Sequence, residues 1–141
     1  MTTIAYDHDN KVIAVDSRMT LQGVISSDDK DKVIYKGAVA WVLCGSICDF
    51  DDFTSLTKGQ RFEGELTLDA SGIRAVDGKA YHVFMHEGVL CEELLTCNLT
   101  LGSGAKFATA AMDYGSSARE AVEYAMTRDI YTGGKAKEVK L

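Results

Sequence analysis

The first residues of the chain have types that suggest a reaction. Met1 is followed by Thr2 and Thr3, and methionine aminopeptidases commonly remove Met before a small residue such as threonine. Removal of Met1 would leave Thr2 with a hydroxyl and a free α-amine on the same residue. An α-amine has an ordinary pKa of about 7.7–8.0, so it can accept the hydroxyl proton near neutral pH. Thr2 is therefore a candidate activated nucleophile. Because many proteins begin with Met-Thr, a strand residue without a chemical role is the alternative interpretation.

A nucleophile of this kind needs a rigid frame, and the first half of the sequence predicts β-strands. The run from Ala38 to Cys44 is apolar on both faces, which indicates a strand covered on both sides. Phe50, Phe53 and Leu56 recur with helical spacing and predict a short helix. The expected elements are strands at residues 2–6, 12–16, 33–35 and 39–44 and a helix at residues 48–56.

The second half of the sequence predicts more strands and then two helices. Strands are expected between Leu66 and His86, with a hairpin turn at Asp77-Gly78, because the apolar residues alternate. The capping box from Ser117 to Glu120 begins a helix. The remaining expected elements are a strand at residues 99–101, a helix at residues 104–114 and a strand at residues 135–141. This order predicts one α+β domain over residues 1–141, with helices packed on a sheet.

Composition and charge exclude several classes of protein. The chain has 15 Lys and Arg residues against 21 Asp and Glu residues, a net charge of −6, which argues against a sequence-blind nucleic-acid binder. The longest apolar run, from Ala38 to Cys44, is far shorter than the ~20 residues of a membrane span. No export signal is visible, so we expect a cytoplasmic protein whose four cysteines are free thiols. A metal site or a disulfide is the alternative for the cysteines.

Five segments along the chain resemble, in order, the proteasome β subunits and the bacterial protease subunit HslV. Those proteins are N-terminal-nucleophile (Ntn) hydrolases. The segments are Thr2-Thr3-Ile4-Ala5, Ile13-Ala14-Val15-Asp16-Ser17-Arg18-Met19-Thr20, Lys32-Val33, Leu101-Gly102-Ser103-Gly104 with Phe107-Ala108, and Arg128-Asp129-Ile130-Tyr131-Thr132-Gly133-Gly134. The resemblance implies the four-layer αββα sandwich of that family, in which two sheets pack between helical layers.

The resemblance also assigns roles to individual residues. Thr2 would be the nucleophile, Lys32 the cation that lowers the pKa of its hydroxyl and amine, and Asp16 the partner that holds Lys32. Ser103 would contact the Thr2 amine, and Asp129 would tie this serine into the network. The remaining implied roles are a hydroxyl in the same network at Thr132, a backbone oxyanion donor at Gly45, and pairing of the segment around Thr20 with an extended peptide. Leu43, next to the expected oxyanion strand end, and Met19 predict a moderately apolar specificity pocket.

Each of these assignments has a plainer alternative, and one segment departs from the family. Asp16 and Asp129 are also typical of turns and helix ends, Ser103 of a helix N-cap, and Lys32 of a solvated charged loop. The family carries two long helices in the middle of the chain, whereas residues 47–63 have room for one short helix. We therefore expect a shortened relative with one helical layer reduced, in which the mode of ring assembly is open.

The resemblance implies a threonine-type peptidase that hydrolyses peptide bonds in peptides or unfolded proteins and needs neither a metal nor an organic cofactor. A homo-oligomeric ring is expected, and any ATP-driven unfolding would come from a separate ATPase, because the chain has no Walker A motif. Two alternatives remain. One is a catalytically inactive structural or binding subunit that keeps Met1, and the other is an Ntn amidase acting on a small molecule.

Overall fold

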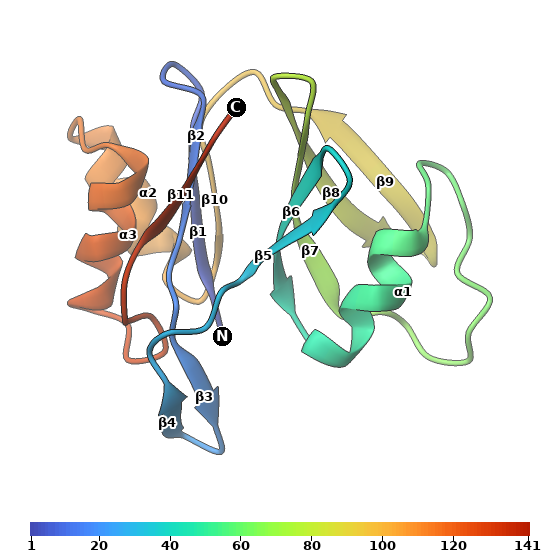
Figure 1. Ribbon diagram of the computed structural model, residues 1–141, viewed down its shortest axis with the longest axis horizontal. Coiled ribbons are helices and arrows are strands. Elements are labelled where there is room, and N and C mark those ends of the chain that lie inside the picture. The colour runs from blue at the N-terminus through green and yellow to red at the C-terminus, as the bar shows by residue number, and fades with distance from the viewer.

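Eleven antiparallel strands form two sheets and a separate hairpin in the computed structural model, which describes all of residues 1–141 (Figure 1). The first sheet has the order β10-β1-β2-β11 and consists of β1 (Thr3–Asp7), β2 (Val12–Val15), β10 (Leu99–Gly102) and β11 (Lys137–Lys140). The second has the order β5-β6-β7-β8-β9 and consists of β5 (Val33–Lys36), β6 (Val39–Gly45), β7 (Ala70–Val76), β8 (Lys79–His86) and β9 (Val89–Leu94). The hairpin pairs β3 (Met19–Leu21) with β4 (Val24–Ser27).

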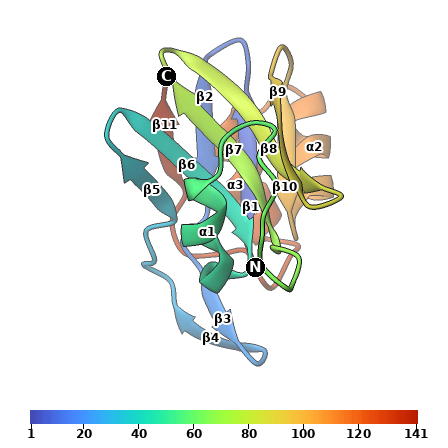
Figure 2. The same cartoon turned by 90° about the vertical axis from the view of Figure 1, so that its right-hand side faces the viewer.

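The helices lie on the outer faces of the two sheets. Helices α2 (Ala105–Asp113) and α3 (Ala118–Met126) pack side by side against the first sheet, and α1 (Phe50–Ser55) covers the second, preceded by a 3₁₀ turn at Ile47–Asp49. Figures 1 and 2 show this sequence of layers, with α2 and α3 on one side, the two sheets in the middle and α1 on the other side. The structure confirms an α+β fold.

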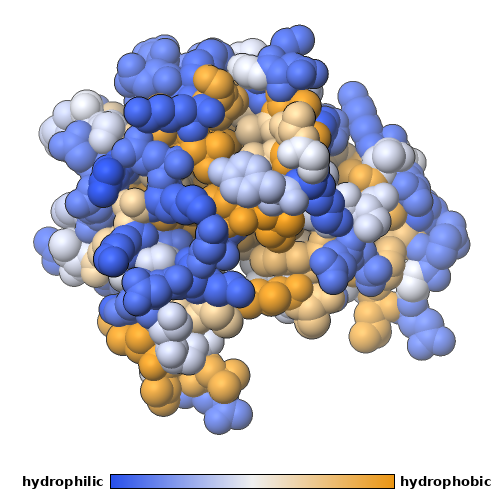
Figure 3. All heavy atoms as spheres, viewed as in Figure 1, coloured by the Kyte–Doolittle hydropathy of each residue, from blue (hydrophilic) through white to orange (hydrophobic).

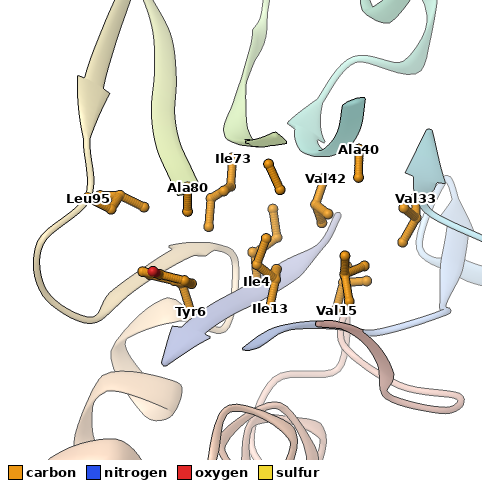
Figure 4. Packing of buried hydrophobic residues seen from close by; sticks show 12 residues of the cluster. Ile4, Tyr6, Ile13, Val15, Val33, Ala40, Val42, Ile73, Ala80 and Leu95 are labelled. Carbon is orange, nitrogen blue, oxygen red and sulfur yellow. The ribbon is translucent and has the colours of Figure 1, made fainter. Parts of the chain in front are cut away.

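The core between the two sheets follows from the alternation of side chains along a strand. Ile4 and Tyr6 of β1 and Ile13 and Val15 of β2 are fully buried and point toward the second sheet (Figure 4). Their neighbours on the opposite face of the first sheet are small, namely Ala5 and Ala14, and they meet the alanines of α2 and α3. Small residues on both surfaces let the helices pack closely against the sheet, which fixes the first sheet from both sides.

Strand β6 is covered on both faces, as its continuous apolar run predicts. Val42 points into the core between the sheets, whereas Trp41 and Leu43 point outward to the layer of α1. The ring of Phe53 in α1 meets the Trp41 ring edge to face, with centroids 6.2 Å apart. The short helix α1 and the loop residues Leu56 and Leu68 together bury the outer face of this interior strand.

The expected elements at the chain's turns and helix starts are present. Asp77 and Gly78 have φ values of +53° and +72° and join β7 to β8 in the two-residue hairpin that this dipeptide favours. At the start of α3, the Ser117 side chain accepts a hydrogen bond from the Glu120 N–H, and the Glu120 carboxylate accepts one from the Ser117 N–H, which completes the predicted capping box.

The expected strand around Leu66 and Leu68 is wrong. Leu68 is buried under α1 and Leu66 is exposed, but both lie in a loop, because strand β6 ends at Gly45, opposite Ala70, and offers no further partner.

The hairpin of β3 and β4 was not predicted from the sequence. It projects from the body and exposes Leu21, Val24 and Ile25, and the apolar patch at the bottom of Figure 3 lies over it.

Candidate active site

Asp16 lies directly after β2 and is the centre of a buried hydrogen-bond network. Its side chain is fully buried. One carboxylate oxygen accepts from the Thr3 N–H at 3.1 Å and from the Lys32 ammonium at 2.9 Å. The other accepts from the N–H groups of Arg18 at 3.3 Å and Gly133 at 3.1 Å. Four donors from four segments of the chain therefore keep this carboxylate in one position.

Lys32 precedes β5 and points from the opposite sheet toward the start of β1. Besides Asp16, its ammonium donates to the carbonyl oxygen of Met1 at 3.0 Å. Its side chain is only 9% exposed, and this burial lowers the pKa of Lys32, whereas the adjacent Asp16 carboxylate opposes the shift. Asp16 and Lys32 thus form a buried ion pair beside the peptide bond that joins Met1 to Thr2.

Thr2 is held in place through its backbone at the end of β10. Its carbonyl oxygen accepts a hydrogen bond from the Ser103 N–H at 2.9 Å. A Cβ atom at Gly102 would lie 1.7 Å from the same oxygen, so β10 can approach Thr2 this closely only because residue 102 is glycine. Thr2 is buried except on the side where it lines a cavity.

The next residue, Thr3, has a structural environment that the sequence analysis missed. Its Oγ1 lies 2.6 Å from that of Thr132 and accepts from the Gly104 N–H at 2.9 Å. Successive side chains of a strand point to opposite faces, so Thr3 faces away from the cavity that Thr2 lines. Because this alternation holds for any strand, the sequence alone carries the signal that separates the two threonines.

Ser103, Asp129 and Thr132 gather at the N-terminal end of α2. Thr132 donates to the Asp129 carboxylate at 2.6 Å. The Ser103 hydroxyl is buried and has no partner with hydrogen-bond geometry, but it lies close enough to Asp129 to affect its ionisation. Burial raises the pKa of Asp129, yet the hydroxyls of Ser103 and Thr132 and the Tyr131 N–H together lower it.

Gly45 ends β6 with φ of +120° and lines the same cavity as Thr2. Just beyond the end of the strand, the Ser46 N–H donates to the Asp69 carbonyl oxygen at 2.8 Å and so faces the β7 side. Because the N–H groups of successive strand residues point to opposite sides, the N–H of Gly45, one residue earlier, is expected to point away from β7. On that side, β5 pairs with β6 only as far as Val33 opposite Val42, which leaves the Gly45 N–H beyond the end of β5.

A cavity of about 260 Å³ joins these groups. Thr2, Lys32 and Gly45 line it together with the three residues expected to contact substrate, Met19, Thr20 and Leu43. The sequence analysis missed the other lining residues that come from β5 and the α1 region, namely Ile34, Ile47, Phe50 and Asp51. A hydroxyl, a buried cation and a backbone N–H around one cavity are the groups that acyl transfer requires.

The structure brings the predicted residues into two adjacent groups. Thr2, Asp16, Lys32, Gly45 and the cavity form the first, and the second, behind Thr3, is formed by Ser103, Asp129 and Thr132. No group of three or more His, Cys, Asp or Glu side chains has an arrangement that could hold a metal ion, and all four cysteines are free. None of the helices has both the length and the apolar character needed to cross a membrane.

Comparison with known proteins identifies the fold. No protein-family model and no curated protein matches the sequence. Solved structures do match. HslV from Trypanosoma brucei aligns over 97% of both chains with a TM-score of 0.74 and 19% identity. BPH from Thiobacillus denitrificans aligns over 99% of this chain and 96% of its own with a TM-score of 0.72 and 19% identity. BPH in complex with epoxomicin also has a TM-score of 0.72, at 17% identity, over 99% of this chain and 97% of its own. Over nearly its whole length, this chain has the fold of the proteasome-like Ntn hydrolases.

Proposed function

We propose that the chain is a threonine-type peptidase in which Thr2, after removal of Met1, is the nucleophile. The observation that carries this proposal is the buried pair of Lys32 and Asp16, which lies beside Thr2 on the wall of a cavity. Removing an ion from water is costly, so a buried cation next to the chain's second residue favours a chemical role for it. Its position is suited to lowering the pKa of a hydroxyl and an amine at Thr2.

The reaction begins with transfer of the Thr2 hydroxyl proton to the free α-amine, directly or through one water. The alkoxide attacks the carbonyl carbon of the substrate, and the oxyanion that develops accepts a hydrogen bond from the Gly45 N–H. Collapse of this intermediate breaks the peptide bond, and the amine returns the proton to the leaving group. Water then hydrolyses the Thr2 ester and frees the enzyme. Lys32 stays protonated throughout and is held by Asp16.

The walls of the cavity suggest the class of substrate. Met19, Leu43 and Phe50 provide apolar surface, which favours a peptide with a large apolar side chain before the cleaved bond. Thr20 lies in the short strand β3 on the rim, where an extended peptide can add as a strand. A panel of fluorogenic peptides tests this preference, and faster cleavage after acidic or basic residues would contradict it.

The proposal extends to the architecture and to partners. The layers correspond to a four-layer αββα sandwich, built as a single domain over residues 1–141, in which α1 alone forms the reduced outer layer. The chemistry uses the chain's own hydroxyl, amines and backbone N–H, so it needs no cofactor. A homo-oligomeric ring would confine the nucleophile, and native mass spectrometry tests it. Unfolding of protein substrates would require a separate ATPase.

The experiment that tests the function is intact-mass analysis of the purified protein with and without epoxomicin, the compound bound in one of the similar structures. We expect loss of the Met1 mass, one covalent adduct on the wild-type protein, none on Thr2→Ala, and an adduct on Thr2→Ser, which keeps a terminal hydroxyl. Absence of an adduct on protein that has lost Met1, together with no peptide cleavage, would overturn the proposal.

A catalytically inactive structural or binding subunit is the second candidate, and it differs from the first in the fate of Met1. With Met1 present, the Thr2 nitrogen is part of a peptide bond, and the Lys32 ammonium donates to the carbonyl of that bond. In this state, Thr2 has no free amine to act as a base. Retention of Met1 in the native protein would therefore identify a structural or binding subunit.

A further inference from the structure

We propose that Arg18 and Asp28 form a clamp that positions the two loops carrying the catalytic groups, and that Arg18 is a positioning residue for the reaction. The clamp joins residues 28–32, which end at Lys32, to residues 129–134, which include the Gly133 N–H that holds Asp16. The inference rests on the proposed function, because its kinetic consequence requires that Lys32 act on Thr2.

The Arg18 guanidinium makes three hydrogen bonds to two separate segments. Its Nε and Nη2 donate to the two Asp28 oxygens at 2.8 and 3.2 Å, which is a bidentate pair. Its Nη1 donates to the carbonyl oxygen of Ile130 at 3.0 Å. The planar fork of arginine suits this arrangement, whereas a lysine ammonium cannot make a bidentate pair and a third bond in another direction.

Glycine at position 133 leaves room for the guanidinium. A Cβ atom there would lie 2.3 Å from the Arg18 Cζ, so the plane of the guanidinium packs directly against the backbone of the loop. This contact gives a physical reason for the first glycine of the Gly133-Gly134 pair, to which the sequence analysis gave no role. The clamp therefore fixes the loop both by a hydrogen bond and by packing.

The neighbouring Ser17 joins the same two segments through backbone and side-chain bonds. Its hydroxyl donates to the Asp28 carbonyl at 2.7 Å and accepts from the Lys135 N–H at 2.6 Å. Its N–H donates to the Gly133 carbonyl at 3.1 Å, and its carbonyl accepts from the Lys30 N–H at 3.0 Å. Both loops are therefore attached to residues 17–18, which directly follow Asp16, so a displacement of either loop is transmitted to the buried ion pair.

Other ion pairs between the same segments are weaker candidates for this role. The Lys135–Asp29 pair spans 3.6 Å between side chains that are 85% and 79% exposed, where solvent screening removes most of its energy. Lys137 and Asp31 are closer, at 2.7 Å, but they also lie largely in solvent. Arg18 is the most buried cation of these pairs, and it is the one with bonds to both loops.

The clamp is tested with Arg18→Met and Asp28→Asn in the full chain after removal of Met1. Arg119→Met is the matched control, because Arg119, on the exposed face of α3, pairs with Glu123 of α3 and Glu138 of β11, away from the cavity. Two readouts are used, namely amide hydrogen exchange in peptides covering residues 28–33 and 129–135, and steady-state kinetics with a fluorogenic peptide.

We expect Arg18→Met to accelerate exchange in both loops and to lower kcat by about 10- to 100-fold, the range for a misplaced catalytic group, with a much smaller change in KM. Asp28→Asn should act in the same direction, and the double variant should be no worse than Arg18→Met alone. Arg18→Lys should restore little of the kcat or of the exchange protection, because a lysine cannot form the bidentate pair with Asp28. Arg119→Met should leave both readouts unchanged.

Three results would overturn the clamp. They are unchanged exchange in either loop of Arg18→Met, full activity in that variant, and full rescue of kcat and exchange by Arg18→Lys. If the wild-type protein itself neither cleaves peptides nor reacts with epoxomicin, the proposed function fails and with it the kinetic role of Arg18. The exchange data then still decide whether Arg18 joins the two loops.

Discussion

Replacing Asp16 by Asn keeps the shape of the side chain but removes the charge that balances Lys32. The carboxylate accepts four hydrogen bonds, two at each oxygen, and an amide has one oxygen and one NH₂. In one orientation of the amide, its NH₂ group would face the N–H groups of Arg18 and Gly133. In the other orientation, it would face the Thr3 N–H and the Lys32 ammonium. Removal of one partner of a buried ion pair costs about 3–5 kcal/mol, and this range should hold here because the Lys32 side chain is 9% exposed.

The loss of stability in Asp16→Asn should shrink as the pH rises. Burial lowers the pKa of Lys32, so the unfolded chain binds this proton more tightly, and stability increases with pH between the folded pKa and the unfolded value of about 10.4. Without Asp16, the Lys32 pKa falls further, because the carboxylate is the group that opposes the shift. The variant can then lose its unpaired charge by deprotonation at a lower pH than the wild-type protein.

Urea unfolding followed by the fluorescence of Trp41, the only tryptophan, measures this effect at pH 7 and pH 9.5. With a slope of about 2 kcal/mol per molar urea, the midpoint at pH 7 should fall by roughly 1.5–2.5 M. Glu92→Gln is the control. It removes a carboxylate that is 11% exposed from Arg74, whose guanidinium does not titrate in this range, so its deficit should not depend on pH in this way. A deficit in Asp16→Asn that stays constant or grows between the two pH values would refute the reasoning.

Three further predictions concern the frame around the site. Gly104→Ala should lower stability by about 1–3 kcal/mol in urea unfolding and reduce peptidase activity, because the new Cβ would lie 2.4 Å from the Thr3 Oγ1. Ser117→Ala should cost about 1 kcal/mol in the same assay and leave epoxomicin labelling intact, because it removes only the N-cap of α3. Asp129 has a net lowered pKa, so its stabilising effect is lost as the pH falls through the acid range, and between pH 5 and pH 3 Asp129→Asn should lose less stability than the wild-type protein in urea titrations.

The sequence predicts the elements that bury a regular apolar face. Strands β1 and β2 alternate between large and small apolar residues, and α3 begins with a complete capping box, so both are visible without tertiary information. The hairpin of β3 and β4 has no such signal, because Leu21 and Val24 point into solvent. Its turn at Gln22-Gly23, with φ values of +51° and +78°, also lacks the usual Asn or Asp.

The candidate site depends on contacts between segments far apart in sequence, which no local pattern encodes. Thr2 was a candidate from its residue type and its position after Met1, whereas Asp16 and Lys32 were identified through the resemblance. The structure contains the ion pair between Asp16 and Lys32. In the structure, the Thr132 hydroxyl bonds to the Thr3 hydroxyl, and the Ser103 hydroxyl has no partner with hydrogen-bond geometry. Both findings depend on how α2 and the loop after α3 pack against β1. Only a tertiary structure can supply such geometry.

The two threonines at the start of the chain show why the position of the first residue matters for this site. Thr3 is completely buried, and its hydroxyl is already engaged with Thr132 and Gly104, so it cannot serve as a nucleophile in this fold. Thr2 faces the cavity, but its nitrogen becomes an amine only when the Met1–Thr2 bond is broken. A one-residue shift of β1 would exchange the two side chains and would also place Ile4 opposite Asp16, which burial of Ile4 in the core between the sheets opposes. The core that fixes the register of β1 therefore also determines which hydroxyl faces the cavity.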